Sequence, residues 1–216
     1  MAISRFKRFF IGVSLALPAA LLSHSLYADA VNNKINYIVD GKVVAGWTAI
    51  TGDPEKWWSP LTELKGQSGS GKLVLEPAQF KTPGDAFRLT WAPRKELHAQ
   101  FSLGGNPIDL KALENAGALV IAMRVLSSPD KAVNIAMRCG DKCEGKIDIS
   151  KNLKKLKKEE WILLPIALNC FSMVGADLSK IATPFEISTD GKLSIEISSI
   201  RLERLGPDEK GCVAEK

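Results

Sequence analysis

The segment LSIEISSIRLERL, residues 193–205, has apolar and polar side chains that alternate in two runs. A period of two is the pattern of a β-strand with one buried face and one solvated face. The alternation recurs in FRLTW at 87–91 and AQFSL at 99–103, whereas LVIAM at 119–123 is apolar throughout, as in a strand buried on both faces. A sheet with one apolar face needs a second layer over it, so the sequence predicts an all-β sandwich or barrel.

Turn residues divide the predicted strands. The pair Asp40-Gly41 lies between the runs 35–39 and 42–44 and predicts a β-hairpin. Pro165 lies inside an apolar run and predicts an edge strand or a bulge, because proline cannot donate to a sheet ladder.

Length and composition bound the fold further. The chain has 216 residues, 45% apolar and 25% charged, which is ordinary globular composition and excludes wholesale disorder, collagen and coiled coil. We predict two short helices, one over 151–158 capped by Ser150 and one single turn over 176–181. No internal repeat or linker divides the chain after residue 30, so we expect one β-sandwich domain over 31–216 with its core at about 47–205.

The first thirty residues have the pattern of a secretory signal peptide. Three basic residues precede an apolar run over 9–22, and Ala28-Asp29-Ala30 has the small-residue spacing of a cleavage site. The alternative is an uncleaved membrane anchor, but a run of about 14 residues is shorter than the roughly 20 that span a bilayer. We therefore expect export to the periplasm or the extracellular space, with no membrane span in the mature chain.

Four cysteines lie after the predicted cleavage point. An even count in an oxidising compartment favours disulfides over zinc ligands or a catalytic thiol. Cys139 and Cys143 flank a Gly-Asp-Lys turn and would face each other across a hairpin, within disulfide range. By elimination the second pair is Cys170 with Cys212.

Several motifs point to chemistry that we do not predict. The segment GQSGSGK at 66–72 fits part of a phosphate loop but leads into a predicted strand instead of a helix. The lysine run over 151–158 carries no interleaved aromatic residues, so we expect a solvated helix face and no nucleic-acid partner. No G-x-S-x-G motif occurs, no spacing selects a pair of carboxylates, and His98 is expected to be a surface residue. We predict no enzyme activity and no catalytic residue.

We expect no cofactor other than a structural calcium ion, for which turn aspartates are the candidate ligands. Calcium prefers six to eight oxygen ligands. Four aspartates lie at turns, but their spacing selects no set, and the ordinary interpretation is that each caps its own turn: Asp40, Asp53, Asp85 and Asp190. We leave the metal ligands unassigned.

The tryptophans are the best indication of a binding surface. Trp57 and Trp58 lie in a stretch, 52–60, that reads as a loop, and adjacent loop indoles do not both reach a core as easily as alternating ones. Flat indoles accept the apolar faces of sugar rings while neighbouring polar groups bond the hydroxyls. The predicted carbohydrate-binding residues are Trp57 and Trp58 with Asp53, Glu55 and Lys56, whereas Trp91 and Trp161 are expected in the core.

The chain resembles a known family over roughly 47–205. The ordered segments that carry the resemblance are GDAFRLTW at 84–91, MRCGDKCEGKIDI at 137–149, WILLPIALNCF at 161–171, GADLSKIATPF at 175–185 and STDGKL at 188–193. Together they are similar to the galactose-binding-like β-sandwich at the C-terminus of ExoP-type exo-β-glucanases of glycoside hydrolase family 3. The resemblance implies a jelly-roll fold, and a structural calcium ion, because galactose-binding-like sandwiches often carry one in a loop. The catalytic domains of those enzymes have no counterpart here, so their activity is not carried over.

Two functions follow as hypotheses. The first is a secreted, non-catalytic carbohydrate-binding or accessory module for a β-glucan-type polysaccharide or oligosaccharide, with a glycosidase as a possible partner. The second is a structural sandwich that docks onto an envelope protein or a glycosidase and binds no sugar.

Overall fold

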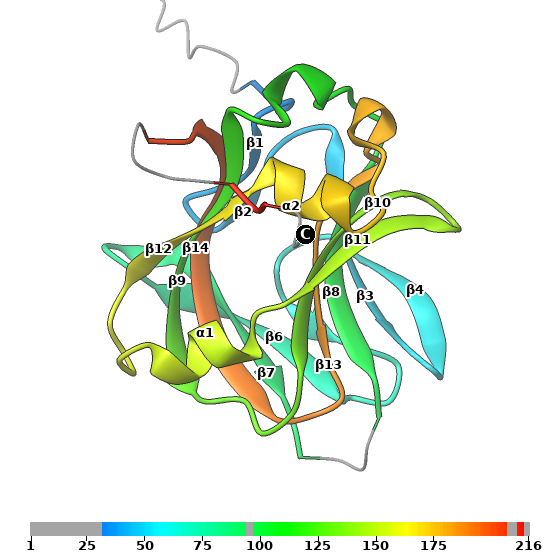
Figure 1. The fold of residues 1–216 in the computed structure, drawn as a ribbon. Helices are drawn as coiled ribbons and strands as arrows, with labels where there is room; N and C mark the ends of the chain where they lie inside the picture. The colour runs from blue at the N-terminus through cyan, green and yellow to red at the C-terminus, as the bar shows by residue number, and fades with distance from the viewer. Residues whose placement is uncertain (1–31, 94–96, 207–210, 214–216) are drawn as a thin grey trace, which may run out of the picture. The chain divides into compact units, whose positions relative to one another are not determined.

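The computed structural model describes residues 32–93, 97–206 and 211–213. The predicted signal peptide, 1–30, lies outside these residues. Within them the chain forms two antiparallel sheets that pack face to face, with only short helical segments between the strands (Figure 1). The all-β sandwich predicted from the alternating pattern is confirmed. None of the helices in the described part is long and apolar enough to cross a bilayer.

The larger sheet has eight strands. Its main path, in spatial order, is β12 (Ile162–Ala167), β9 (Gly117–Ser127), β14 (Leu193–Arg204), β7 (Pro83–Trp91), β6 (Leu73–Gln79) and β5 (Gly66–Gln67). The hairpin of β1 (Asn36–Val39) and β2 (Lys42–Val43) joins it through β14. Pro165 lies in the edge strand β12, as predicted, where a missing backbone donor is tolerated.

The smaller sheet has six strands. In spatial order they are β11 (Cys143–Asp148), β10 (Val133–Gly140), β13 (Thr183–Thr189), β8 (Ala99–Gly105), β3 (Trp47–Asp53) and β4 (Lys56–Leu61). Strand β4 forms one edge and the Cys139–Cys143 hairpin of β10 and β11 forms the other.

Four short helical segments connect the strands. They are η1 (Lys111–Leu113), α1 (Ser150–Lys155), α2 (Leu168–Met173) and η2 (Leu178–Lys180). The sequence missed α2, and it misassigned the cap of α1: Ser150 is the first helical residue, and the Asp148 carboxylate accepts its backbone N–H at 2.8 Å.

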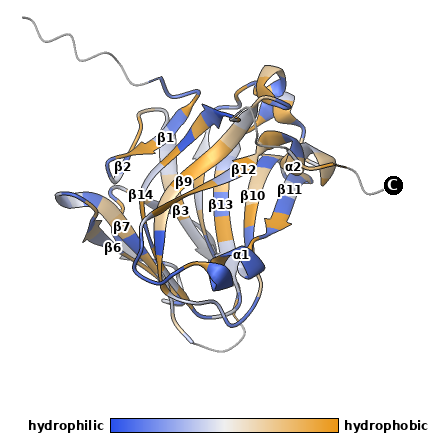
Figure 2. Cartoon of the chain, turned by 60° about the vertical axis from the view of Figure 1, so that its left-hand side comes forward, coloured by the Kyte–Doolittle hydropathy of each residue, from blue (hydrophilic) through white to orange (hydrophobic). Residues whose placement is uncertain are grey.

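Aromatic side chains join the inner faces of the two sheets. Phe87 of β7 packs against Phe101 of β8 with ring centroids 5.4 Å apart, and Phe101 packs against Phe185 of β13 at 6.2 Å. Trp91 is buried in the same core, as predicted. Strand β9 is buried on both faces over its first seven residues, and its hydrophobic colouring contrasts with the hydrophilic α1 (Figure 2).

Trp161 is not a core residue, contrary to the prediction. It lies half-buried just before β12, 4.5 Å from the ring of Phe80, with the Arg124 guanidinium 5.2 Å above its own ring. The apolar run after Trp161 predicts a buried strand. It does not show that β12 is an edge strand, or that Trp161 lies before its first residue.

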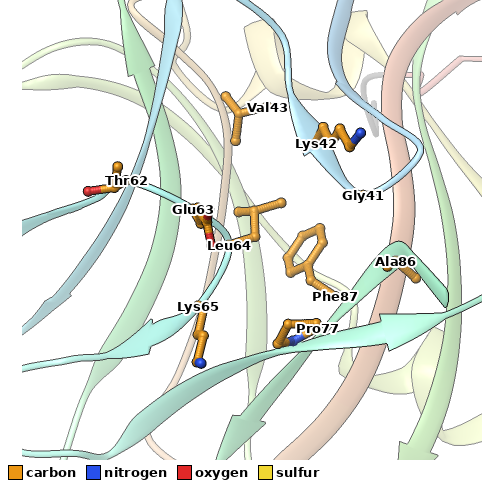
Figure 3. A pocket seen from close by; sticks show the side chains of 11 residues that line it. Gly41, Lys42, Val43, Thr62, Glu63, Leu64, Lys65, Pro77, Ala86 and Phe87 are labelled. Atoms are coloured by element: carbon orange, nitrogen blue, oxygen red, sulfur yellow. The ribbon is translucent and has the colours of Figure 1, made fainter.

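One edge of β14 is shared by two strands in succession. Strand β7 pairs with residues 193–197 and β1 pairs with residues 200–201, and the amide of Gly41 donates to the Ser198 carbonyl between them at 2.8 Å. Asp40 and Gly41 both have positive φ, 47° and 66°, as a two-residue hairpin turn requires. A pocket of about 430 Å³ lies near the point where the partner of β14 changes from β7 to β1. In this pocket Val43, Leu64 and Phe87 point toward one another (Figure 3).

Candidate ligand groove

The exposed face of the six-stranded sheet carries a groove of about 560 Å³. It runs from β4 across β3, β8 and β13 to the tip of the β10–β11 hairpin. Its lining is mixed, with tryptophans at one end and polar side chains along the floor: Ile50, Trp57, Trp58, His98, Gln100, Ser102, Arg138, Gly140, Asp141, Ala182, Thr183 and Glu186.

A β-bulge places both tryptophans in the groove. Thr51 pairs with Ser59 and Asp53 with Lys56, so Gly52 alone lies opposite Trp57 and Trp58. A bulge sets two residues against one, which brings adjacent side chains toward the same face. Gly52 is required here because a Cβ on it would lie 2.5 Å from the Trp57 carbonyl oxygen. The expectation of a loop at 52–60 is therefore wrong, but both indoles are exposed, at 53% and 61%.

The floor of the groove holds a buried ion pair. The Glu186 side chain, 2% exposed, accepts from Arg138 Nε at 2.6 Å and from Nη2 at 2.7 Å. Arg138 Nη1 also lies 2.6 Å from an oxygen of Glu144 on β11. The hydrogen bonds from Arg138 to Glu186 raise the pKa of this guanidinium further above its ordinary value, against the opposing effect of burial. One arginine thus joins three strands of the sheet.

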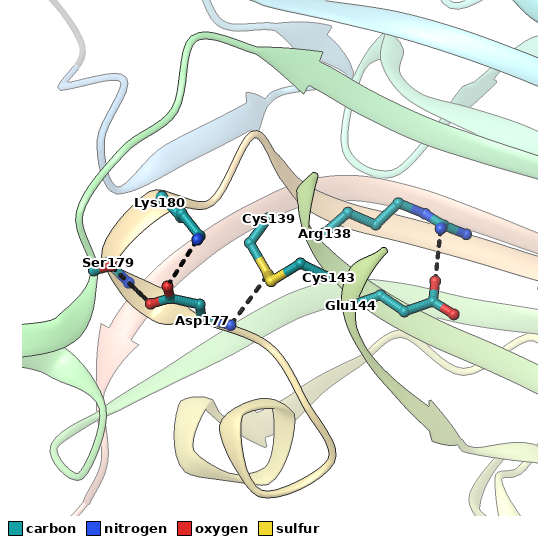
Figure 4. The surroundings of a disulfide bond; sticks show 7 residues. All are labelled: Arg138, Cys139, Cys143, Glu144, Asp177, Ser179 and Lys180. Atoms are coloured by element: carbon teal, nitrogen blue, oxygen red, sulfur yellow. Dashed lines mark hydrogen bonds and ion pairs between the residues drawn. A yellow bond between two sulfur atoms is a disulfide. The ribbon is translucent and has the colours of Figure 1, made fainter. Parts of the chain in front are cut away.

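A disulfide closes the end of the groove. Cys139 and Cys143 are bonded, with their Cα atoms 5.0 Å apart, and they directly adjoin Arg138 and Glu144 (Figure 4). The backbone N–H of Asp177 donates to the Cys139 sulfur at 3.1 Å, which ties the hairpin tip to the loop before η2. Cys170 and Cys212 form the second disulfide. Both predicted pairings are confirmed.

His98 flanks the tryptophan end. Its Nδ1 lies 2.7 Å from a carboxylate oxygen of Asp190, and its ring lies 6.0 Å from that of Trp57. Asp190 follows β13, and its carbonyl oxygen accepts from the Lys72 ammonium at 3.1 Å, while the Ala92 carbonyl oxygen accepts from the same ammonium at 2.7 Å. Lys72 is 1% exposed, and this burial lowers the pKa of its ammonium.

The structure corrects the prediction for Asp53. This side chain is fully buried and accepts from the amides of Glu55, Lys56 and Ser70 and from the Ser70 hydroxyl, at 2.7–3.1 Å. Burial alone would raise the pKa of the carboxyl, but the hydrogen bonds outweigh it and lower the pKa to about 2. Asp53 anchors the β3–β4 hairpin to the 68–71 turn instead of facing a ligand.

Glu55 and Lys56 are exposed at the tip of the same hairpin and do not line the groove. Sequence reasoning missed the polar floor, Gln100, Ser102, Arg138, Thr183 and Glu186. The alternation in β8 does mark Gln100 and Ser102 as facing outward. No local signal indicates that Arg138 meets Glu186, because the two lie 48 residues apart and meet through strand pairing.

Asp85 caps its own turn, as predicted, but Asp53 and Asp190 also make contacts outside theirs, with Ser70 and with His98. Asp85 accepts from the amides of Phe80, Lys81 and Thr82 at 2.7–2.9 Å. Burial alone would raise the pKa of its carboxyl, but the hydrogen bonds together outweigh burial and lower the pKa to about 2. Among the described residues, no group of three or more His, Cys, Asp or Glu side chains is arranged to hold a metal ion. The segment 66–72 forms β5 and the turn into β6, so it opens a strand and not a helix.

Comparison with known proteins gives a family and a set of similar folds. The model of the Exop_C family, described as galactose-binding domain-like, matches residues 47–202. No curated protein matches the chain.

Three of the solved structures that share the fold illustrate the similarity. The extra C-terminal domain of the exo-1,3/1,4-β-glucanase ExoP from a Pseudoalteromonas species is 19% identical, with a TM-score of 0.68 over 84% of this chain and 99% of that domain. A family 30 carbohydrate-binding module of a Clostridium thermocellum cellulase is 14% identical, with a TM-score of 0.56 over 81% of this chain and 98% of that module. A family 11 module from the same organism, in complex with a β-1,3-1,4-mixed-linked tetrasaccharide, is 14% identical, with a TM-score of 0.50 over 78% of this chain and 95% of that module.

Proposed function

The chain belongs to the Exop_C family of galactose-binding-like domains, and from that premise we propose that it is a non-catalytic carbohydrate-binding module for a β-glucan-type polysaccharide. Two of the similar structures support this choice of ligand by their names. One is a domain of an exo-1,3/1,4-β-glucanase, and the other is a module in complex with a β-1,3-1,4-linked tetrasaccharide. We further propose export to the periplasm or the extracellular space, which the two disulfides support because such bonds persist in oxidising compartments.

The observation that carries the proposal is the pair of exposed indoles in one groove. A folded protein usually buries tryptophan, because each ring removes a large apolar surface from water. Here a bulge and a glycine opposite it keep Trp57 and Trp58 at the surface, next to a row of polar side chains. An apolar platform beside hydrogen-bonding groups is what a pyranose needs, since its ring offers C–H faces and its rim offers hydroxyls.

The shape of the groove favours an extended chain as ligand. It crosses from β4 to β10, and four intervals of about 4.8 Å between neighbouring strands give a length of roughly 19 Å. That length accommodates several sugar residues in a row. We therefore propose that the module binds a stretch of polysaccharide, and that a glycosidase acting on the same polymer is its functional partner.

The test is binding of the protein to mixed-linkage β-1,3/1,4-glucan by isothermal titration calorimetry. We expect a dissociation constant on the order of 10 µM to 1 mM, as for a small wet site. Trp57→Ala and Trp58→Ala should each weaken binding about tenfold or more, with the melting temperature nearly unchanged because both indoles are exposed. Trp161→Ala is the control, since Trp161 lies just before β12 at the edge of the other sheet and does not line the groove, and this variant should bind as the wild type does.

Two results would contradict the proposal. If the wild type binds none of a panel of β-1,3- and β-1,4-glucans, the docking hypothesis becomes the better explanation of the exposed indoles. If Trp57→Ala lowers the melting temperature as much as a core truncation does, the indole is part of the fold and not a platform.

A further inference from the structure

The basic side chains that line the groove are already paired with carboxylates. Arg138 bonds Glu186 through Nε and Nη2, and its remaining terminal nitrogen lies against Glu144. His98 bonds Asp190. No other Lys, Arg or His side chain lines the groove in the part of the chain that the structure describes.

Carboxylates lie both in the groove and beside it. Glu186 is fully buried beneath the groove, and Asp141 lines it at the exposed hairpin tip. Glu144 is shared between Arg138 and the Lys146 ammonium, which lies 3.4 Å away on the same strand. An anionic group entering the groove would therefore meet an arginine that is occupied and acidic side chains that repel it.

We propose that Glu144 and Asp141 make the groove selective for uncharged polysaccharide chains and exclude polymers that carry carboxylate or sulfate groups. This inference rests on the proposed carbohydrate-binding function and names the class of ligand at the same site. The physical basis is repulsion between like charges, combined with the engagement of Arg138 and His98 by carboxylates. Glu144 acts through Arg138: while it holds that guanidinium, the guanidinium cannot turn toward an anionic substituent.

The experiment compares two forms of one polymer. Mixed-linkage β-glucan and its carboxymethyl derivative of the same chain length are titrated against the wild type at about 20 mM and about 0.5 M salt. At low salt we expect the carboxymethyl polymer to bind about tenfold more weakly than the neutral one, and the ratio to shrink at high salt as the charges are screened.

Two variants assign the selectivity to residues. Glu144→Gln should reduce the roughly tenfold ratio to about threefold, because its amide removes one charge and weakens the hold on Arg138. Asp141→Asn, at an exposed position, should act in the same direction without a risk to folding. Glu160→Gln is the matched control, since Glu160 is also paired with a lysine, Lys157, but lies outside the groove.

The outcomes separate this inference from the proposed function. The inference is overturned if the wild type binds the two polymers equally. It is also overturned if Glu144→Gln and Asp141→Asn both show the same affinity ratio as Glu160→Gln. In either case the proposed function stands. Failure of the wild type to bind the neutral polymer overturns both.

Discussion

The two sheets carry charged clusters of opposite arrangement on their outer faces. In the groove, Arg138 lies between the two carboxylates of Glu186 and Glu144. On the eight-stranded sheet, Glu196 lies between the two guanidinium groups of Arg88 and Arg124, with contacts of 2.8 and 2.5 Å. Both buried glutamates, Glu186 and Glu196, are nearly inaccessible to solvent, but Glu186 has a single arginine partner and Glu196 has two.

The two clusters differ in how many arginines neutralise the buried glutamate. A buried carboxylate is costly when it has no partner, because the protein interior solvates the charge poorly. Glu196 keeps one arginine if the other is lost, whereas Glu186 depends on Arg138 alone among the described ion pairs. In the groove, the stability of the buried carboxylate therefore depends on one arginine, whereas on the outer face of the other sheet it depends on two.

The largest expected effect is at Arg138. Arg138→Met leaves Glu186 buried without its guanidinium and should lower the free energy of unfolding by about 3–5 kcal/mol. Denaturant unfolding measures this directly. A loss below about 1 kcal/mol would show that water replaces the guanidinium, and the contrast between the two clusters would then not hold.

Removal of the groove disulfide should have a smaller effect on stability. The Cys139–Cys143 bond spans a sequence separation of 4, for which loop-closure entropy gives about 2 kcal/mol. Cys139→Ser/Cys143→Ser should lose about that amount in denaturant unfolding and should also weaken glucan binding, because the bond adjoins Arg138. If the double variant is folded and its affinity for glucan is unchanged, the hairpin tip does not contribute to binding.

Asp53 should make the groove sheet sensitive to acid. Its folded pKa, about 2, is below the ordinary 3.8, so its contribution to stability is fully present above about pH 4–5 and is lost as pH falls toward 2. The shift corresponds to about 2 kcal/mol. Unfolding free energies measured between about pH 6 and pH 2.5 should fall less steeply for Asp53→Asn than for the wild type, and parallel slopes would contradict the assignment.

The smallest effect is expected at Arg124. Arg124→Met leaves Glu196 bonded to Arg88 and should cost about 1 kcal/mol of unfolding free energy, with glucan binding unchanged. The same denaturant series used for Arg138→Met gives the value. A loss as large as that of Arg138→Met would mean that the second arginine does not compensate.

The sequence was sufficient for the sandwich because the alternation is local. Residues 193–205 and 99–103 each show which side chains face inward without knowledge of their partners, and the Asp-Gly turn marks the end of a strand. The disulfides followed from the count of cysteines and from the short spacing of one pair. These are properties of single segments.

The groove was only half predictable, because it depends on register. The exposure of Trp57 and Trp58 was expected, but its cause is a bulge opposite Gly52, which the segment 52–60 alone does not reveal. The sequence predicts that Asp53 binds a sugar, but its side chain is buried and bonds Ser70, 17 residues away. The contact of Arg138 with Glu186 arises from the pairing of β10 with β13 and has no signature in either strand.

Because Lys72 is buried, the rate of its chemical modification can report how often the surrounding loops open. Amine-reactive reagents modify a neutral, accessible amine, and this side chain is enclosed, with its ammonium bonded to the carbonyl oxygens of Ala92 and Asp190. Its modification thus requires these loops to separate, and they are the loops that hold His98 beside Trp57. The rate at which Lys72 is labelled in the native protein, read by peptide mass spectrometry, would measure how often that end of the sandwich opens.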